Sequence, residues 1–385
     1  MFTSSISFVN FKKKIKYTKV KKNLKLIIDN KSQNQVIKSL SKNYKNSFKK
    51  EKLENYRKFK NFRVIGMGGS ILGTQSIYDF LKNRIKKNFL FFDNLQNYKK
   101  KEKKKFTNLI VSKSGNTIET IVNSNILIKK KEKNIFITEN KKNYLYLLAE
   151  KLKAEIIHHN NFIGGRYSVL SEVGMLPVEL MGLKSQKFKQ FNSLIKNKKF
   201  LNALIENVSS ILFFIKEKKF NSVIINYDEK ADSLFKWYQQ LVAESLGKNK
   251  NGLLPVVSNM PKDNHSVMQL YLDGFQNNFF TFFYVHENQS EKINNKLILS
   301  PQKFLNNKYV SNIKYAQKKA SENVFKKKKI PYRSFEIKKR DEKTLGELFT
   351  FFILETILIG KCLNLNPFDQ PAVELIKKET RKLLI

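Results

Sequence analysis

The sequence predicts an α/β protein with mostly parallel sheets. Short apolar segments that suit buried strands alternate with longer segments of helical periodicity, first over residues 62–180 and again from residue 222 onward. Alternation at this spacing is typical of parallel strands that are covered by helices on both faces of the sheet. The chain of 385 residues is also long enough for two domains, each with a substantial core.

In the first stretch, each candidate strand is a short apolar run. The first run leads into a glycine-rich turn at residues 66–70 and then into an amphipathic helix. A lysine-rich helix is expected between the second and third runs, and residues 1–60 have a mostly helical, lysine-rich pattern. The expected strands are residues 62–65, 89–92, 109–111, 134–138 and 155–158.

In the second stretch, the alternation resumes after residues 185–219, which we expect to form two helices linking the halves. The chain ends in a turn at residues 366–371 and a last helix, whose first turn suits Pro371. The expected strands are residues 222–227, 253–257, 279–285 and 332–337, and the expected helices are residues 231–246, 314–328 and 345–363.

The composition argues against several classes of protein. The longest apolar stretch, residues 348–359, is interrupted by Glu355 and falls short of the ~20 residues that a membrane-spanning helix needs. The N-terminal segment is too short and too polar for the core of a signal peptide. A single cysteine, Cys362, rules out an internal disulfide framework, and none of the four histidines has the spacing of a metal site. We therefore expect a soluble, cytoplasmic protein without a bound metal.

The formal net charge of +42 raises the question of nucleic-acid binding. Only seven of the 74 basic residues are arginine, and the lysines are spread along the whole chain. Proteins that read bases rely on arginine, and single-strand binders interleave aromatic residues with a basic groove. Here most aromatic residues are Phe within strand and helix patterns. Solvated surface lysines explain the charge better than a nucleic-acid site, and the charge favours the approach of an anionic substrate.

Residues 111–117 form the most informative segment, because a buried strand ends there in small polar residues and a helix begins near Thr117. Such a junction turns backbone N–H groups and hydroxyls toward one point, and the helix N-terminus adds about half a positive charge. This pattern suits a bound phosphate. Capping of the helix by Asn116, with Glu119 three residues later, explains part of the same pattern, so these residues alone leave both interpretations open.

A second junction, residues 66–70, follows the first strand. Its spacing, G-x-G-G-S, differs from the G-x-G-x-x-G pattern of dinucleotide-binding folds, and no acidic ribose ligand follows at a suitable distance. If the two strands are neighbours, both junctions open at the carboxyl edge of one sheet. Open α/β folds bind their ligands at that edge.

Three other residues are candidates for chemistry. Gly164 and Gly165 precede Arg166, so the backbone there can approach a ligand closely, although a surface arginine after a flexible turn fits as well. Glu244 lies near the end of a helix and is either a solvated glutamate or a positioned base; its neighbours alone favour the solvated glutamate. His265 stands at an expected helix start.

Taken together, these motifs resemble those of the glucose-6-phosphate isomerase family. They occur in the family's order and cover the chain from about residue 62 to its end. A single motif would be weak, whereas the ordered set is highly specific. The matching segments are IGMGGSILG, VSKSGNTIETI, GGRYSVLSEVGMLP, QLVAESLGKNKNG, DNHSVMQLYLDG and NPFDQPAVELIKK.

The resemblance implies two sugar-isomerase (SIS-type) three-layer α/β/α domains. The expected division is an N-terminal helical segment (1–55) packed on the second domain, a first domain with a phosphate cradle (56–183), and a second domain with the base and a C-terminal helix (184–385). A homodimer is implied, with active sites between domains and near the partner subunit. The implied reaction interconverts glucose 6-phosphate and fructose 6-phosphate in glycolysis and gluconeogenesis, without a metal, a redox cofactor, nucleic acid or a membrane.

The resemblance also assigns roles to residues. Glu244 matches the base that moves a proton between C1 and C2 of the open-chain sugar through a cis-enediol(ate), and Arg166 matches the residue that stabilises the developing negative charge. His265 matches the ring-opening histidine, which the neighbouring subunit contributes, and Lys377 the lysine that assists ring opening. Gln370 matches a residue that contacts sugar hydroxyls. The phosphate cradle falls on Ser70, Ser112, Ser114 and Thr117, with backbone contacts from Gly69 and Lys113.

The sequence departs from the family pattern at Asn116, where threonine is usual, and at Ile376, where glycine is common. Three alternatives stay open. A bifunctional glucose/mannose phosphate isomerase shares the fold, but the ESLGK and FDQP segments argue against it. A non-catalytic sugar-phosphate sensor would need the cradle but not Glu244. A nucleic-acid binder would show salt-dependent binding to DNA.

Overall fold

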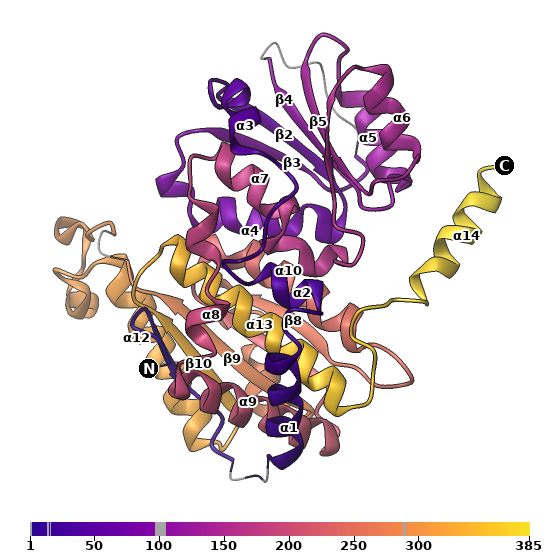
Figure 1. The fold of residues 1–385 in the computed structure, drawn as a ribbon. Helices are drawn as coiled ribbons and strands as arrows, with labels where there is room; N and C mark the ends of the chain where they lie inside the picture. Colours follow the sequence, from indigo (N-terminus) through magenta and orange to yellow (C-terminus); the bar gives the residue numbers. More distant parts are fainter. Residues whose placement is uncertain (1, 14, 16, 97–104, 288–289) are drawn as a thin grey trace.

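The computed structural model describes residues 2–13, 15, 17–96, 105–287 and 290–385. It contains two five-stranded sheets, which Figure 1 shows in two separate parts of the molecule, with helices packed on them. All strand pairings except that of the first strand are parallel. The predicted α/β class with mostly parallel sheets is therefore confirmed.

The first sheet has the strand order β3–β2–β4–β5–β6. Alternate residues of its central strand join different apolar clusters: Leu109 and Val111 pack on one face and Ile110 on the other. Because a strand turns successive side chains to opposite faces, a strand that is apolar throughout needs helices on both sides. The strands are β2 (Asn61–Gly66), β3 (Asn88–Phe92), β4 (Thr107–Val111), β5 (Lys133–Thr138) and β6 (Glu155–His158), and the helices are α4 (Leu72–Phe80), α5 (Ile118–Leu127), α6 (Tyr144–Lys151) and α7 (Glu172–Leu180).

The second sheet has the order β1–β10–β9–β7–β8. Its edge strand β1 (Ile6–Val9) pairs antiparallel with β10, in the register Ile6 opposite Ile337, and Phe8 packs 4.5 Å from Phe335 between ring centroids. The expectation that residues 1–60 are mostly helical was therefore wrong for this segment, where a strand forms because it completes the edge of a sheet. The other strands are β7 (Asn221–Asn226), β8 (Leu254–Asn259), β9 (Asn278–Val285) and β10 (Tyr332–Ile337).

Helix α10 (Asp232–Leu246) connects the two halves of the molecule. It packs on α4 from the first half and on α13 (Glu342–Cys362) and β8 from the second. Helix α13 is buried along almost its whole length, with α1 (Thr18–Asp29) and α9 (Lys198–Lys216) against it. Residues at the end of α10 are thereby held in a fixed position relative to the first sheet.

The remaining helices include several short ones. Residues 185–219, expected as two helices, form a 3₁₀ turn η4 (Ser185–Phe188), a single turn α8 (Phe191–Leu194) and α9. The lysine-rich helix expected before β4 falls largely on residues 97–104, outside the described residues. The others are α2 (Gln35–Ser39), α3 (Lys50–Arg57), α11 (Met268–Asp273), α12 (Val310–Lys327) and α14 (Val373–Leu383).

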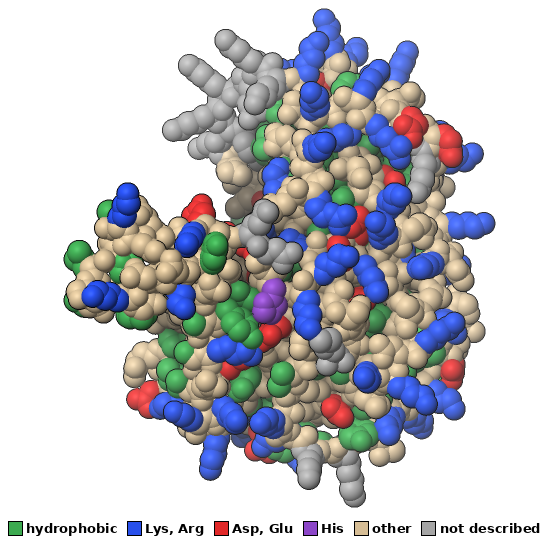
Figure 2. Space-filling view, turned by 90° about the vertical axis from the view of Figure 1, so that its left-hand side faces the viewer, with side chains coloured by type: hydrophobic (Ala, Val, Ile, Leu, Met, Phe, Trp, Pro, Cys, Tyr) green, Lys and Arg blue, Asp and Glu red, His purple; other side chains and the backbone are tan. Residues whose placement is uncertain are grey.

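Two surface features bear on function. Figure 2 shows lysine and arginine side chains distributed over both halves of one face rather than confined to one groove. Helix α14 projects away from the body of the chain, and none of its residues is buried. In the described part of the chain, no helix has both the length and the apolar character that crossing a membrane requires.

Candidate active site

The two glycine-containing junctions begin side by side. Strands β2 and β4 are parallel neighbours, and Gly66 at the end of β2 pairs with Val111 at the end of β4. The 3₁₀ turn η1 (Gly68–Ser70) and the segment that starts at Ser112 therefore open at the same carboxyl edge of the first sheet. This arrangement was the one expected from the sequence if the two strands were neighbours.

The junction after β4 has the geometry of an anion site. Gly115 has a φ of +65°, and a Cβ there would lie 1.8 Å from Oδ1 of Asn143, so that only glycine fits. The hydroxyls of Ser112 and Thr117 lie 2.9 Å apart. Thr117 is the N-cap of the ten-residue helix α5, and its side chain makes no capping hydrogen bond. The first N–H groups of α5 are thus available to a ligand.

Two side chains of this junction have other partners. Asn116, expected as a helix cap, instead accepts a hydrogen bond from the backbone N–H of Tyr144 at 3.1 Å, so the capping interpretation was wrong. Nζ of Lys113 donates to the carbonyl oxygen of Asn161 at 2.7 Å, and burial lowers the pKa of this lysine. The ammonium group of Lys113 is therefore engaged by residues outside the segment 111–117.

The junction after β2 is pressed against two other segments. Gly68 has a φ of +51°, and a Cβ there would lie 2.7 Å from Nε2 of Gln240 on α10. A Cβ at Gly69 would lie 2.1 Å from the carbonyl carbon of Gly165, at the start of the 3₁₀ segment η3 (Gly165–Leu170). The two glycines permit this close approach. They bring Arg166 and the end of α10 to the edge where both junctions open.

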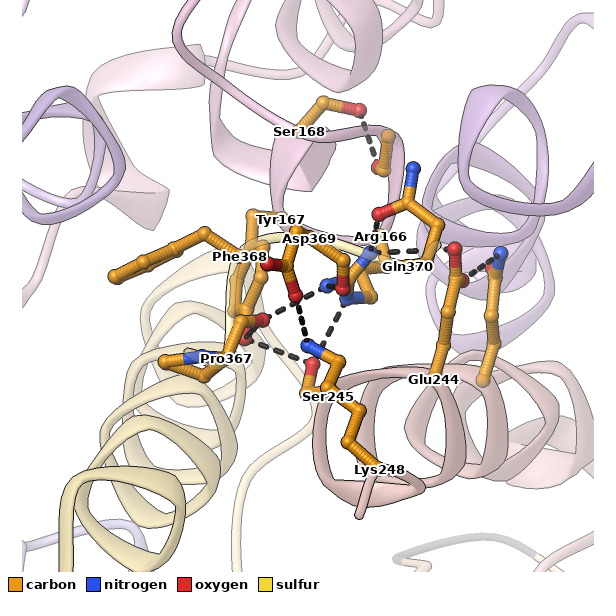
Figure 3. A network of polar contacts seen from close by, with 12 residues as sticks. Arg166, Tyr167, Ser168, Glu244, Ser245, Lys248, Pro367, Phe368, Asp369 and Gln370 are labelled. Carbon is orange, nitrogen blue, oxygen red and sulfur yellow. Dashed lines mark hydrogen bonds and ion pairs between the residues drawn. The ribbon is translucent and has the colours of Figure 1, made fainter. Parts of the chain in front are cut away.

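Arg166 is buried, with an exposed fraction of 2%, and all three nitrogens of its guanidinium donate hydrogen bonds (Figure 3). Nε donates to Oγ of Ser245 at 2.8 Å, and Nη1 donates to Oε1 of Gln370 at 2.8 Å. Nη2 donates to the carbonyl oxygens of Pro367 and Asp369, at 2.8 and 3.0 Å. The interpretation of Arg166 as a surface arginine was therefore wrong, and its guanidinium has one fixed orientation.

Glu244 lies opposite this guanidinium. Its Oε1 is 3.2 Å from Nη1 of Arg166, and its Oε2 accepts a hydrogen bond from Nε2 of Gln240 at 2.9 Å. The side chain is 22% exposed, so that a ligand can reach the carboxylate. The solvated glutamate that its neighbours in the sequence favoured does not fit these contacts. A carboxylate beside a fixed cation is suited to move a proton to and from a carbon that becomes negatively charged.

Comparison with known proteins identifies the family. A model of the phosphoglucose isomerase family matches residues 25–384. A glucose-6-phosphate isomerase of Methanocaldococcus jannaschii is 33% identical over 366 residues, which cover 87% of each chain, and one of Mycoplasmopsis pulmonis is 32% identical over 88% of this chain and 84% of its own.

The chain belongs to the phosphoglucose isomerase family.

Solved structures with low sequence identity share the fold. A hypothetical protein of Thermus thermophilus superposes with a TM-score of 0.81 at 21% identity and covers 95% of this chain and 96% of its own. A glucose-6-phosphate isomerase of Chlamydia trachomatis has a TM-score of 0.67 at 19% identity, covering 93% of this chain and 74% of its own. This member of the phosphoglucose isomerase family therefore shares its fold with both structures.

Two residues with family-implied roles lie apart from Glu244. His265 is exposed at the end of the 3₁₀ turn η6 (Lys262–Asn264), and its imidazole makes no hydrogen bond or ion pair with the described residues. Lys377 lies on the projecting helix α14, where its Nζ is 2.6 Å from Oε1 of Glu374. Within this single chain, Arg166 contacts both Glu244 and Gln370, whereas no hydrogen bond or ion pair joins His265 or Lys377 to Glu244 among the described residues.

Sequence reasoning missed three polar residues of this site. Gln240 lies one helical turn before Glu244, and this i, i+4 spacing was a readable signal. Tyr167 donates to the carbonyl oxygen of Pro367 at 2.9 Å and lies 2.8 Å from Oγ of Ser245; burial raises the pKa of its hydroxyl. Ser245 adjoins the expected base, but a serine in a helix carries no signal of its own.

Proposed function

We propose that the protein interconverts glucose 6-phosphate and fructose 6-phosphate. The observation that carries this proposal is the 3.2 Å contact between the Glu244 carboxylate and the Arg166 guanidinium, beside two small-residue junctions at one sheet edge. The names of the relatives, glucose-6-phosphate isomerases in an archaeon and a mycoplasma, support the same pair of substrates.

In the proposed reaction, Glu244 is the base. It takes the proton from C2 of the open-chain aldose, the electron pair of that C–H bond forms the C1=C2 double bond of a cis-enediol(ate), and the π pair of the C1 carbonyl moves onto O1. A proton then passes from the C2 hydroxyl to O1, and the same carboxyl returns its proton to C1 as the C2–O bond becomes the carbonyl of the ketose. Arg166 lies against the oxygen that becomes negative. A fixed donor at such an oxygen typically contributes ~10²–10³ in kcat. The proton returns to the neighbouring carbon, so the overall reaction transfers no electrons to or from a cofactor.

We propose that the two junctions bind the phosphate group of the substrate. Ser112, Ser114 and Thr117 supply hydroxyls from one side and Ser70 from the other, with backbone N–H groups at Gly69 and Lys113. The supporting observations are the adjacency of the strand ends, the uncapped start of α5 and the positive φ of Gly115. Gln370, which is held by Arg166, is proposed to contact sugar hydroxyls. Anchoring the phosphate fixes C1 and C2 relative to the base.

We also propose that the active form is a homodimer. Helix α14 carries exposed apolar side chains, with Leu375 65% and Ile376 71% exposed, and it projects away from the described part of its own chain. Large exposed apolar groups on a helix without a partner favour association. His265, which is exposed and away from Glu244, would then serve the site of the neighbouring subunit, and Lys377 would join a site once α14 is packed.

The division into an N-terminal segment (1–55), a first domain (56–183) and a second domain (184–385) is likewise a proposal. The first of the two larger parts contains one whole sheet, and the second contains four strands of the other. The fifth strand of that sheet, β1, belongs to the N-terminal segment, whose α1 also packs on elements of the second part.

The deciding experiment is a coupled assay that converts fructose 6-phosphate to glucose 6-phosphate and reads NADPH from glucose-6-phosphate dehydrogenase. Turnover at low protein concentration is expected. Mannose 6-phosphate is assayed in parallel as a second substrate. Turnover of both sugars would favour the bifunctional isomerase. Binding of the sugar phosphate without turnover would favour a sensor.

A further inference from the structure

Lys248 links the end of α10 to the turn formed by residues 366–370. It follows Gly247, which ends the helix, and its side chain is only 11% exposed. Its Nζ lies 2.6 Å from Oδ1 of Asp369 (Figure 3). The same Nζ also donates to the carbonyl oxygen of Asn366. The hydrogen bond from Lys248 holds the pKa of Asp369 below its ordinary value. One ammonium group therefore holds the turn at two points.

The turn itself is closed by local hydrogen bonds. Nδ2 of Asn366 donates to Oδ2 of Asp369 at 2.8 Å, and Oδ1 of Asn366 accepts from the backbone N–H of Phe368 at 3.1 Å. In this conformation the turn directs the carbonyl oxygens of Pro367 and Asp369 toward Nη2 of Arg166. Two of the acceptors that orient the guanidinium therefore come from the segment that Lys248 holds.

We propose that Lys248 is a positioning residue: its bond to Asp369 fixes the turn that orients Arg166 toward Glu244. Lys248 lies four residues after Glu244 in the chain, so the same end of α10 carries the proposed base and holds the turn. This inference rests on the proposed function, because it assumes that the Arg166–Glu244 geometry serves the reaction. In this role Lys248 need not contact the substrate.

A purely structural role for this ion pair would predict a different result. Asp369 is half exposed, with 52% of its side chain accessible, and ion pairs at such sites contribute little to stability. Catalysis, in contrast, is sensitive to small displacements of a group that faces the reacting atoms. Loss of the ion pair should therefore lower kcat while the unfolding free energy stays nearly unchanged.

The test compares Lys248→Met, Asp369→Asn and the double variant with the wild type. Lys250→Met, two residues further at an exposed lysine, is the matched control for loss of charge. Each single variant is expected to lose roughly tenfold or more in kcat, with KM changed by less than about twofold. The double variant should lose no more than the more affected single variant, Lys248→Arg should recover part of the loss, and Lys250→Met should match the wild type.

The inference is overturned if Lys248→Met or Asp369→Asn keeps the wild-type kcat, if the two losses multiply in the double variant, or if Tm falls in parallel with kcat. Glu244→Gln is measured in the same series. If Glu244→Gln turns over normally, the proposed function fails; if Glu244→Gln is inactive while Lys248→Met is normal, only the positioning role fails.

Discussion

Nη1 of Arg166 and Oε1 of Glu244 lie 3.2 Å apart although the two residues belong to different halves of the molecule. Arg166 follows the first sheet, and Glu244 lies in the last turn of α10, the helix that joins the halves. Nε1 of Trp237, on the same helix as Glu244, donates to the carbonyl oxygen of Arg166 at 3.1 Å. The backbone and the side chain of Arg166 therefore both contact α10, the helix that carries the carboxylate.

Replacement of the proposed base is the first prediction. Glu244→Gln keeps the shape of the side chain and its contact with Gln240 but removes the ability to accept the proton from carbon. We expect kcat to fall by at least ~10²–10⁴, with the dissociation constant of the sugar phosphate changed little, as measured by isothermal titration calorimetry. Glu206→Gln, at an exposed glutamate of α9, serves as the matched control.

Near-normal turnover in Glu244→Gln would exclude this residue as the base. A parallel loss of binding and turnover would instead assign Glu244 to ligand binding, and the sensor interpretation would gain support.

The phosphate cradle gives the second prediction. Ser114→Ala combined with Thr117→Ala removes two hydroxyls from the junction after β4, and each hydrogen bond to a charged group contributes about 1.5–3 kcal/mol. KM for fructose 6-phosphate should therefore rise by roughly tenfold or more for each hydroxyl, with a smaller change in kcat. Ser32→Ala, at an exposed serine near the N-terminus, is the control. An unchanged KM in the double variant would place the phosphate elsewhere.

The sheet edge was predictable from the sequence because its signals are local. An apolar run such as Leu109 to Val111 requires burial on both faces, and small residues after it require a tight junction. Strands of this kind and the Gly115 turn follow from those rules. The sequence alone did not reveal that β2 and β4 are neighbours; the structure supplies that adjacency.

Features that depend on distant partners were not predictable in this way. Strand β1 is a four-residue segment whose conformation is set by pairing with β10, far along the chain. The burial of Arg166 depends on acceptors near Pro367, and the role of Gln240 depends on the approach of Gly68. Helix α14 was predictable from its sequence pattern, whereas its projection away from the body of the chain was not.

The proposed exchange of His265 between subunits gives the third prediction. Glu244→Gln and His265→Ala are each expected to be nearly inactive on cyclic glucose 6-phosphate. In a mixed dimer, the subunit with an intact Glu244 receives His265 from the other variant, so that one complete site forms. Co-refolding of the two variants should therefore restore activity. If each site uses its own His265, both sites of the mixed dimer stay defective and the mixture is no more active than its components.

Lys189 provides a prediction about stability. Its Nζ is fully buried and donates to the carbonyl oxygens of Ser39, at 2.6 Å, and of Leu170, at the end of η3. Burial lowers the pKa of Lys189 to about 7, and the charge of Glu172 only partly opposes this shift. Between this pKa and the ordinary value of 10.5, the unfolded chain carries a proton that the folded chain has released. Since the unfolded state then binds more protons, folding stability rises with pH across this window.

The expected slope from Lys189 is at most about 1.4 kcal/mol per pH unit between pH 7 and 10. Urea unfolding at several pH values measures it, with Lys189→Met compared to the wild type and Lys184→Met, at an exposed lysine, as the control. Lys189→Met leaves two carbonyl oxygens without their donor and should be less stable at every pH, so the slope rather than the absolute value is the readout. The slope should flatten in Lys189→Met and persist in Lys184→Met. Equal slopes in all three proteins would mean that Lys189 stays protonated in the folded chain, with its charge stabilised by the two carbonyl oxygens and Glu172.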